Sequence, residues 1–254
     1  MAPLNGGRIL VIAGSDSSGG AGIVRDVEVA TILGARAAVA ITAVTAQTDQ
    51  RVEAVEPMTP ALVTAQMRAA LAAERIGAIK TGMLCNAGIV ASVIDLLNEY
   101  PDMPLVVDPV VRSSSGAALL DADGLRLLRD RLLPRAAIVT PNLPELALLV
   151  EESEALDESG AIRQADILVA RGSRAVLIKG GHATGEAAVD ILVRADRAPV
   201  RFETARLSGT MRGTGCALAT AIAVSLAQGE TLDVSVGRAK HTVFDLIGKA
   251  LRRT

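Results

Sequence analysis

The chain has 254 residues, half of them apolar, which is enough to bury a substantial core in one large domain or two small ones. Its formal net charge is −2 and its basic residues form no run or stripe, so the composition argues against a nucleic-acid-binding protein. Two distant cysteines and two histidines indicate neither a disulfide framework nor a zinc site.

The N-terminal stretch MAPLNGGRILVIAG lacks the basic region and long apolar run of a signal peptide. No stretch approaches the roughly 18 uninterrupted apolar residues of a membrane-spanning helix. We therefore expect a cytoplasmic protein without a membrane partner. No linker or change in composition divides residues 1–254, so we expect a single domain.

Short apolar runs alternate with helical patterns along the first two thirds of the chain. The runs predict buried strands at 8–14, 36–44, 78–83, 104–110, 136–142 and 175–181. The helical patterns cover 22–33, 59–73, 87–100, 121–133, 143–150 and 161–172. This alternation is typical of βαβ units, which form a parallel sheet with helices on both faces.

Two segments depart from this alternation. Residues 51–58 alternate between apolar and polar, as in an edge strand. After residue 182, segments 188–195 and 198–207 predict an antiparallel pair of strands. Two helices, at 214–228 and roughly 232–250, then close the chain.

Polar motifs follow several of the predicted strands. In open parallel sheets, ligands bind beyond the carboxyl ends of the strands. We therefore expect one edge of the sheet to gather Asp16, Gln47, Met83, Asp108, Asn142, Glu145 and Lys179. This convergence indicates a ligand site more strongly than any one motif does.

The first of these motifs, GSDSSGGAGI, is a glycine-rich loop between a strand and a helix. It lacks the GxGxxG spacing, and Gly19 is followed by Gly20 where the Walker pattern requires lysine. Its glycines would allow the backbone to approach a ligand closely, or they form only a flexible turn.

The segment RGTGC opens the predicted helix at 214–228. Gly213, Thr214 and Gly215 would expose successive backbone N–H groups at a helix N-terminus, which favours an anion such as a transferring phosphoryl group. A thiol at Cys216 in that field should be more acidic than a free thiol. It could accept a proton from a substrate hydroxyl or attack an electrophile, or it could simply pack the helix start.

Charged and amide side chains at the other strand ends also have two interpretations. Asp108 and Glu145 suit Mg²⁺, which takes one or two carboxylates together with phosphate oxygens. Asn142 and Glu145 also have the spacing of a helix capping box. Lys179 would offset charge in phosphoryl transfer or be solvated. Asp26 reads by default as an exposed helix acid, and Cys85 as structural.

Seven motifs then stand in order along the chain: AGSDSSGGAGI, ITAVTAQ, IKTGML, VVDPV, LLPRAAIVTPNLPE, VLIKGGH and RGTGC. Together they resemble the hydroxymethylpyrimidine/phosphomethylpyrimidine kinases of thiamin biosynthesis, within the ribokinase-like superfamily. The resemblance covers roughly residues 8–250. It implies a three-layer α/β/α sandwich with a mostly parallel central sheet and helices on both faces.

The resemblance also implies an activity. Such enzymes use MgATP to phosphorylate the hydroxymethyl group of 4-amino-5-hydroxymethyl-2-methylpyrimidine, and many then convert the monophosphate to the diphosphate. Relatives are commonly homodimers, so we expect a homodimer here.

Roles carry over to individual positions of this sequence. The substrate-binding residues would be Gly14, Asp26, Gln47, Met83 and Val110, with Asp26 and Gln47 hydrogen-bonding the aminopyrimidine. Asp108 and Glu145 would hold Mg²⁺. The ATP phosphates would meet Asn142, Lys179, Gly213 and Gly215. Catalysis would rest on Cys216 and Lys179, with Gly213, Thr214 and Gly215 as the anion hole.

Residue 216 is informative within the superfamily, because most of its members carry aspartate there. Cysteine is typical of the pyrimidine kinases and of some pyridoxal kinases. The chain departs from the family pattern at Arg212, where histidine is usual, and at Ser17, where proline is common. The segment GARAAVA lacks the usual aromatic residue.

Three alternatives stay open. A pyridoxal or pyridoxine kinase shares the GTGC option, although the first loop and TAQ favour the pyrimidine. A non-catalytic pyrimidine- or nucleotide-binding relative would not need the set of Lys179, Glu145, Asp108 and GTGC. A cysteine hydrolase or thiol peroxidase lacks a convincing base, because His182 is the only histidine at a predicted strand end.

Overall fold

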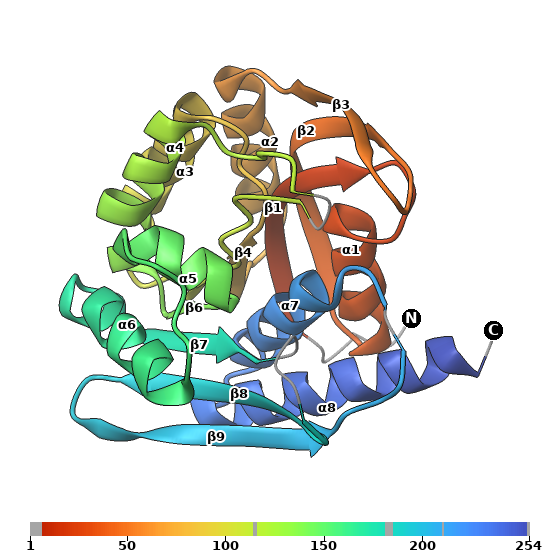
Figure 1. Ribbon diagram of the computed structural model, residues 1–254. Coiled ribbons are helices and arrows are strands. Elements are labelled where there is room, and N and C mark those ends of the chain that lie inside the picture. Colours follow the sequence, from red (N-terminus) through yellow and green to blue (C-terminus); the bar gives the residue numbers. More distant parts are fainter. Residues whose placement is uncertain (1–6, 114–115, 181–184, 210, 253–254) are drawn as a thin grey trace.

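The computed structural model describes residues 7–113, 116–180, 185–209 and 211–252, and its strands form one sheet through the middle of the molecule (Figure 1). The strand order is β3-β2-β1-β4-β5-β6-β7-β8-β9. The parallel strands are β2 (Arg36–Gln47), β1 (Arg8–Asp16), β4 (Ala78–Thr81), β5 (Leu105–Val107), β6 (Ile138–Val139) and β7 (Ala175–Lys179). The predicted parallel sheet is therefore confirmed.

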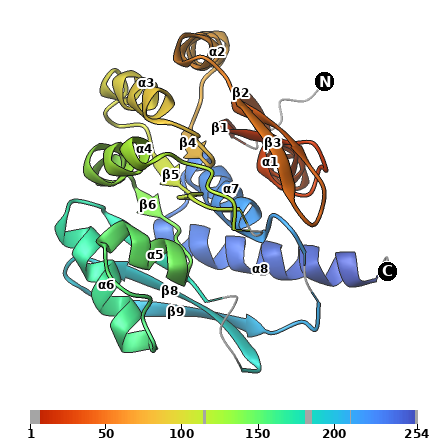
Figure 2. The same cartoon turned by 45° about the horizontal axis from the view of Figure 1, so that its top comes forward.

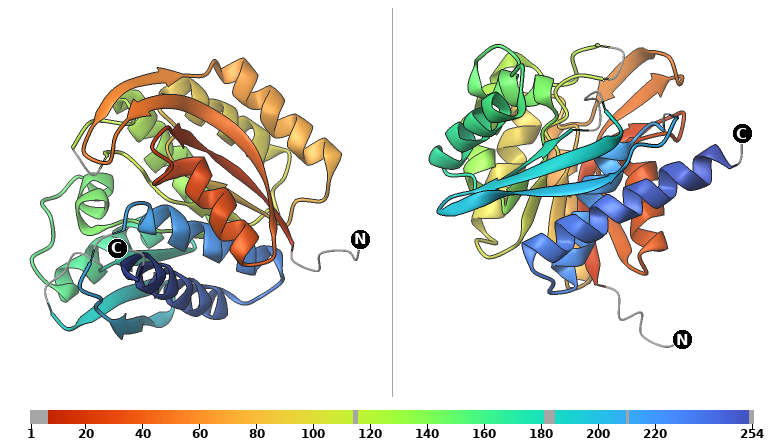
Figure 3. Two further views of the ribbon diagram at one scale, coloured as in Figure 1. Left: turned by 90° about the vertical axis from the view of Figure 1, so that its right-hand side faces the viewer. Right: turned by 60° about the horizontal axis from the view of Figure 1, so that its bottom comes forward.

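Antiparallel strands complete the sheet at both edges. β3 (Val52–Pro57) pairs with β2, which confirms the predicted edge strand. At the other edge, β8 (Ala187–Arg194) pairs with β7 and β9 (Arg197–Ala205) pairs with β8, all antiparallel. Figure 3 shows the long β8–β9 hairpin with the last helix, α8 (Leu232–Leu251), running beside it.

Helices cover both faces of the sheet (Figure 2). One face carries α2 (Pro60–Ala73), α3 (Ala87–Asn98), α4 (Ala122–Leu127), α5 (Leu143–Val150) and α6 (Glu158–Ala170). The other carries α1 (Gly22–Ile32), α7 (Thr214–Ala227) and α8. This is the three-layer α/β/α sandwich that the resemblance implied. None of the helices in the described ranges is long and apolar enough to cross a membrane.

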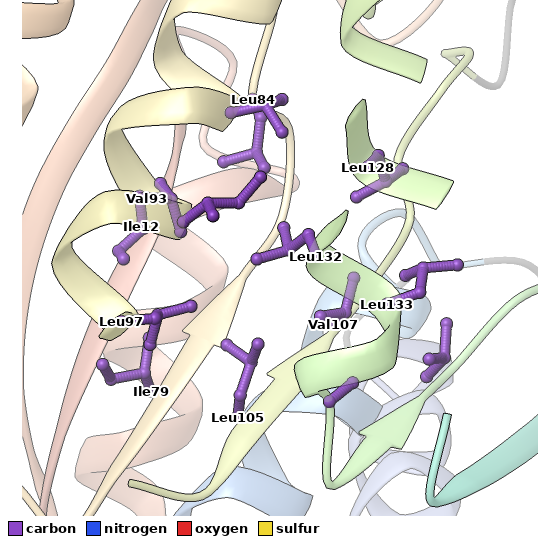
Figure 4. Packing of buried hydrophobic residues seen from close by; sticks show 14 of the residues in the cluster. Ile12, Ile79, Leu84, Val93, Leu97, Leu105, Val107, Leu128, Leu132 and Leu133 are labelled. Atoms are coloured by element: carbon purple, nitrogen blue, oxygen red, sulfur yellow. The ribbon is translucent and has the colours of Figure 1, made fainter. Parts of the chain in front are cut away.

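The two cores follow from the alternation of side chains along each strand. In β1, Leu10 and Ile12 pack on the face of α3, whereas Ile9 and Val11 pack on the face of α7. Aliphatic residues fill the core on the α3 side (Figure 4), in a chain whose aromatic residues are one tyrosine and two phenylalanines. Because both faces of the parallel strands are buried, their sequences are continuous apolar runs.

Most helices begin at a side-chain cap. Six of the eight α-helices in the described residues have an N-cap side chain that accepts a backbone N–H of the first turn, as Thr59 does from Leu62. The Asp157 cap starts α6 three residues before the predicted boundary. The exceptions are α1 and α7, whose N-cap residues are Ala21 and Gly213. Both of these uncapped starts lie at the site described below.

Strand lengths differ from the prediction in a way that matters for the site. β1 continues to Asp16 and β2 to Gln47, with a shift of register between Ala13 and Ser15. The TAQ motif is therefore the end of a strand rather than the loop after it. β5 and β6 contain only three and two residues, shorter than their apolar runs.

The helix predicted over 121–133 is not continuous. After α4 the chain makes one π-helical turn, Leu128–Leu132, and one 3₁₀ turn, Leu133–Arg135. Pro134 has no N–H to donate to a carbonyl oxygen one turn earlier, so a regular helix cannot continue past it. The irregular turns still bury Leu128, Leu132 and Leu133 (Figure 4).

Candidate active site

A cavity of about 610 Å³ opens at the carboxyl ends of the parallel strands. Its volume is in the range of small-molecule sites. All seven side chains predicted to gather at this edge line it: Asp16, Gln47, Met83, Asp108, Asn142, Glu145 and Lys179. The predicted convergence of these motifs is therefore confirmed.

The cavity brings together nearly all other predicted site residues. The remaining lining residues from that set are Gly14, Val110, Gly213, Thr214, Gly215 and Cys216. Among the predicted site residues, Asp26 alone is not in the lining. His182 lies outside the described residues.

The structure requires a correction for Asp26. Its carboxylate accepts two hydrogen bonds from Lys80 Nζ, at 2.9 and 2.8 Å, and one from Thr220 Oγ1 at 2.7 Å. Both side chains of the Asp26–Lys80 pair are fully buried. A buried ammonium needs such a partner, because an unpaired charge there is very costly. Asp26 is therefore neither an exposed helix acid nor open to a ligand here, and Lys80 is the member of the pair that lines the cavity.

Lys179 stands at the centre of a charged cluster. Its Nζ lies 2.8 Å from Asp108 Oδ1 and 3.6 Å from Glu145 Oε2. Burial lowers the pKa of Lys179, but the two carboxylates outweigh it and raise the pKa above its ordinary value. Lys179 is therefore a fixed positive charge at neutral pH, beside the first turn of α7.

Gly215 marks how closely α7 approaches this cluster. A Cβ placed on Gly215 would lie 3.2 Å from Lys179 Nζ and 3.7 Å from Asp108 Oδ2. The uncapped N-terminus of α7 and the Lys179 ammonium therefore face the same small volume. Both favour negative charge, as the anion-hole interpretation of GTG predicted.

Both interpretations of Asn142 and Glu145 are realised at once. Asn142 Oδ1 accepts the N–H of Glu145 at 2.8 Å, and Glu145 Oε2 accepts the N–H of Asn142 at 2.9 Å. This capping box starts α5 and also holds the Glu145 carboxylate against Lys179. The cap therefore positions a cavity residue.

Asp108 and Glu145 suit a hard cation such as Mg²⁺ only if a bound ligand supplies further oxygen atoms. No group of three or more His, Cys, Asp or Glu side chains in the described residues could hold a metal ion. Asp108 and Glu145 supply the one or two carboxylates that Mg²⁺ usually takes, and the remaining positions would fall to phosphate oxygens and water. The donor set fits Mg²⁺ delivered with a nucleotide.

Cys216 differs from its expected acidity. The surrounding protein raises the pKa of its thiol to about 11, chiefly by desolvation; Lys80 lowers it, and Asp26 and Asp108 raise it further. The N–H of Gly22, at the start of α1, donates a hydrogen bond to the sulfur. The expectation of an acidified thiol at the helix N-terminus is therefore wrong for this structure, because burial outweighs the nearby positive groups.

Arg212 connects three segments at the mouth of the cavity. Its Nη1 donates to Ser18 Oγ at 2.7 Å and to Asp49 Oδ1 at 2.9 Å, and its Nη2 donates to Asp16 Oδ2 at 3.3 Å. Nη1 also lies 3.3 Å from the carbonyl oxygen of Thr48. Through its guanidinium, Arg212 therefore holds the loop after β1 and the β2–β3 turn together, directly before the anion hole.

The cavity has a second lobe that was not predicted from the sequence. Its lining comes from the β8–β9 hairpin, the segment after it and α8, and includes Ala188, Thr204, Leu207, Val243, Phe244 and Ile247. The spacing of Val243 and Ile247 marked one helix face, but only the packing of α8 beside β9 shows that this face meets a cavity. A buried ion pair, Lys240 Nζ with Asp190 Oδ2 at 2.9 Å, also lines the cavity.

Fold and site together define a small-molecule kinase with the ribokinase-like three-layer architecture. Comparison with known proteins narrows this class. The family model described as phosphomethylpyrimidine kinase matches residues 16–253, and the chain belongs to this family.

Curated relatives agree with the family assignment. The chain is 41% identical over 244 residues to the hydroxymethylpyrimidine/phosphomethylpyrimidine kinase of Rhizobium meliloti, covering 96% of this chain and 91% of the relative. It is 40% identical over 245 residues to the thiamine biosynthesis bifunctional protein ThiED of Geobacter sulfurreducens. That match covers 95% of this chain but 49% of the relative, so the chain spans about half of the bifunctional protein.

Solved structures share the architecture. The phosphomethylpyrimidine kinase of Clostridium difficile matches with a TM-score of 0.82 and 34% identity, over 94% of this chain and 99% of that one. The pyridoxal kinase of Staphylococcus aureus, solved in complex with AMP-PCP and pyridoxal, matches with a TM-score of 0.85 and 28% identity, over 95% of this chain and 87% of that one.

Proposed function

We propose that this chain uses MgATP to phosphorylate 4-amino-5-hydroxymethyl-2-methylpyrimidine, and then its monophosphate, for thiamin biosynthesis. One observation carries the proposal. One cavity is lined by three sets of residues. Gln47 and Met83 lie near the ends of β2 and β4, apolar side chains form a lobe beside α8, and Lys179 lies with the start of α7. The names of the relatives at about 40% identity support the same substrate.

The pyrimidine would occupy the part of the cavity lined by Gly14, Gln47, Met83 and Val110. A Cβ on Gly14 would lie 3.0 Å from Met83 Sδ, so the glycine leaves room for the sulfur beside the backbone of β1. A polarizable thioether suits the face of a flat ring in a chain with few aromatic side chains. Gln47 would hydrogen-bond the ring substituents through its amide.

The nucleotide would lie between the apolar lobe and the strand ends. The base would contact the lobe formed by the β8–β9 hairpin and α8, where Phe244 offers an aromatic ring. The phosphates would reach Asn142, Lys179 and the N–H groups of Gly213–Gly215. Asp108 and Glu145 would hold Mg²⁺, which when bound neutralises charge on the transferring phosphoryl group.

Catalysis would rest on charge and position. Lys179 and the α7 N-terminus would stabilise negative charge on the phosphoryl oxygens as the phosphoryl group moves toward the substrate hydroxyl. Because the thiol of Cys216 has a pKa of about 11, it would be protonated at neutral pH. We propose that Cys216 orients the hydroxyl and that the thiolate, where it forms, takes the hydroxyl proton; a loose transition state needs little help from a base.

Pyridoxal phosphorylation is the second candidate, because the Staphylococcus aureus structural neighbour is a pyridoxal kinase. A coupled ADP-release assay with purified, Mg²⁺-supplied protein would compare the aminopyrimidine, its monophosphate and pyridoxal. We expect the highest kcat/KM with the aminopyrimidine. No turnover with any of the three would refute the kinase proposal, and a preference for pyridoxal would favour the alternative.

Further properties are proposed from the resemblance. We propose one kinase domain over residues 1–254, a homodimer, and a cytoplasmic location without a nucleic-acid partner. Light scattering on the purified chain would test the dimer: a mass near twice the 26.1 kDa of one chain is expected.

A further inference from the structure

We propose that Asp190, held in place by Lys240, positions the end of β7 and with it Lys179 for phosphoryl transfer. The inference rests on the proposed function, since it concerns the step in which Lys179 acts. Asp190 and Lys240 are positioning residues in this proposal, because they act through Lys179 and not on the transferring group itself.

Asp190 and Lys240 form a buried ion pair between β8 and α8. Lys240 Nζ lies 2.9 Å from Asp190 Oδ2, and the two side chains are 8% and 6% exposed. Taking two charges out of water costs free energy, and apolar side chains of similar volume are often at least as stabilising. Stability alone is therefore a weak reason for a pair at this place, and the other contact of Asp190 indicates a further role.

The second oxygen of Asp190 meets the end of β7. Its Oδ1 accepts the backbone N–H of Gly180 at 3.0 Å. The ladder between β7 and β8 ends at the pair of Lys179 with Asp190, so this N–H has a side chain as its acceptor in place of a backbone carbonyl. A Cβ on Gly180 would collide with the carbonyl oxygen of Val189, so the two chains lie very close together here. The Asp190 carboxylate therefore extends the pairing of the two strands by one hydrogen bond.

The backbone at Lys179 is thus held from both sides. Its own N–H donates to the carbonyl oxygen of Pro141 at 2.8 Å, on the side of β6. The next N–H, that of Gly180, donates to Asp190 on the side of β8. Without the Asp190 acceptor, the backbone that carries the Lys179 ammonium would be fixed on the β6 side only.

Lys240 connects this strand end to the apolar lobe of the cavity. It lies on the same face of α8 as Val243, Phe244 and Ile247, one and two helical turns away, and all four line the cavity. The helix face that would contact the nucleotide base therefore also holds the strand that carries Lys179. A displacement of about 1 Å in an active site can lower a rate by about 10²-fold, so even a small movement of this strand end would be measurable.

Two double variants separate the hydrogen bond from the ion pair. Asp190→Asn/Lys240→Met removes both charges, but the asparagine carbonyl oxygen can still accept the N–H of Gly180. Asp190→Leu/Lys240→Met removes both charges and the acceptor. We expect the asparagine variant to keep kcat within about threefold of the wild type and the leucine variant to lose about tenfold or more. KM for the aminopyrimidine should stay within about twofold in both, because Lys179 acts on the phosphoryl group.

Two further measurements do not depend on turnover. Hydrogen exchange of the Gly180 amide, followed by NMR, should stay at the wild-type rate in the asparagine variant and accelerate about tenfold or more in the leucine variant. Calorimetry with AMP-PCP and Mg²⁺ should show an affinity about tenfold lower in the leucine variant alone, because a displaced Lys179 would lose its contact with the phosphates.

Arg194 and Asp233 supply the matched control. They also join β8 to α8 by an ion pair, at 2.6 Å, and neither residue is in the cavity lining. Arg194→Met/Asp233→Leu should therefore keep kcat, AMP-PCP affinity and Gly180 exchange at the wild-type values. A loss of kcat as large as that of Asp190→Leu/Lys240→Met would show that any weakening of the contact between β8 and α8 impairs the enzyme, and would overturn the inference.

The remaining outcomes also decide. Equal kcat in the asparagine and leucine variants overturns the inference, as does wild-type exchange of Gly180 in the leucine variant. If the leucine variant loses its cooperative thermal transition, Asp190→Val/Lys240→Met takes its place, since valine is favoured in strands. If that variant also fails to fold while the asparagine variant folds, the acceptor is structural and the inference is overturned.

Failure of the proposed function would be seen separately. A wild-type chain that phosphorylates no pyrimidine refutes the proposed substrate, and AMP-PCP affinity then decides on the inference: wild-type affinity in the leucine variant overturns it, and an affinity about tenfold lower supports it. If the wild-type chain does not bind AMP-PCP either, the inference falls together with the proposed function.

Discussion

At the scale of single residues, the Asp26–Lys80 pair places an ammonium group in the cavity lining. Its two hydrogen bonds to Asp26 keep this ammonium from pairing with another group. Lys80 lies in β4 at the centre of the sheet, and its counter-ion comes from α1, 54 residues earlier. Breaking one member of such a pair is strongly destabilising, whereas replacing both with apolar groups of similar volume is often tolerated.

We therefore predict that Lys80→Met destabilises the fold by about 3–5 kcal/mol. Asp26→Leu/Lys80→Met should recover most of that loss, because no unpaired charge then remains. Urea denaturation of the three chains measures both values. A cost below about 1 kcal/mol for Lys80→Met would contradict a buried, uncompensated Asp26 carboxylate.

Cys216 is the second residue whose behaviour follows from burial. Because its pKa is about 11, its thiolate fraction increases about tenfold for each unit by which the pH rises toward that value. In a Cys85→Ser background, iodoacetamide labelling of Cys216 should therefore accelerate about tenfold per unit between about pH 7 and pH 10. A labelling rate that levels off below about pH 9 would show an acidified thiol and contradict the burial argument.

The same cysteine separates a functional from a packing role. Cys216→Ser should lower kcat far more than Cys85→Ser does if the thiol orients the hydroxyl or takes its proton. Cys85 suits the control because it lies in the segment before α3 and is not in the cavity lining. Equally small effects of the two substitutions would remove the thiol from catalysis.

At the scale of elements, α7 is built to leave its first turn available. Its N-cap is Gly213 in a left-handed conformation with φ of 74°, and no side chain caps the helix. A Cβ on Gly213 would collide with the carbonyl oxygen of Gly20, so only glycine fits this turn. The start of α7 lies beside the start of α1 (Figure 1), which explains why two uncapped helices meet at one cavity.

Gly215→Ala tests this arrangement, because residue 215 lies inside the helix, where alanine is favoured over glycine. We predict an unchanged or slightly higher melting temperature together with a kcat lower by about tenfold or more, since the new methyl group would lie 3.2 Å from Lys179 Nζ and displace it. Gly213→Ala should instead lower both the melting temperature and kcat. Wild-type kcat in Gly215→Ala would contradict a role for the close approach of α7 to Lys179.

At the scale of the whole molecule, the cavity spans the sheet from β2 to β9. The parallel half supplies Gln47 at the end of β2 and Met83 just after β4, and the antiparallel hairpin with α8 supplies the apolar lobe. The two halves can therefore be impaired separately. This separation follows from the strand order, because each lobe sits over a different part of one continuous sheet.

Phe244→Ala should raise KM for ATP about tenfold, because the nucleotide base would lose its aromatic contact. KM for the aminopyrimidine should stay within about twofold. Gln47→Ala should show the opposite pattern, with the pyrimidine KM raised. Steady-state kinetics with each substrate varied in turn would measure both KM values for each variant. A rise in both KM values for Phe244→Ala would place the base elsewhere.

Much of the fold could be read from local patterns. Apolar runs and caps predicted the order of strands and helices along the chain, and motifs at strand ends predicted which side chains would gather at one edge of the sheet. The interrupted segment after α4 was missed, although Pro134 marks its end, because an apolar helical pattern and an irregular apolar turn look alike in sequence. The apolar lobe was missed because its side chains come from three segments with no polar motif.

The sequence by itself determined the backbone plan of this protein: a parallel sheet, helices on both faces, and polar strand ends gathered at one edge. Only the tertiary structure decided which charges pair across it. Arg212 meets Asp16 across 196 residues, Asp26 turns inward to Lys80, and burial makes Cys216 less acidic rather than more. Periodicity and caps act over a few residues, whereas ion pairs and desolvation depend on neighbours that only the folded chain brings together.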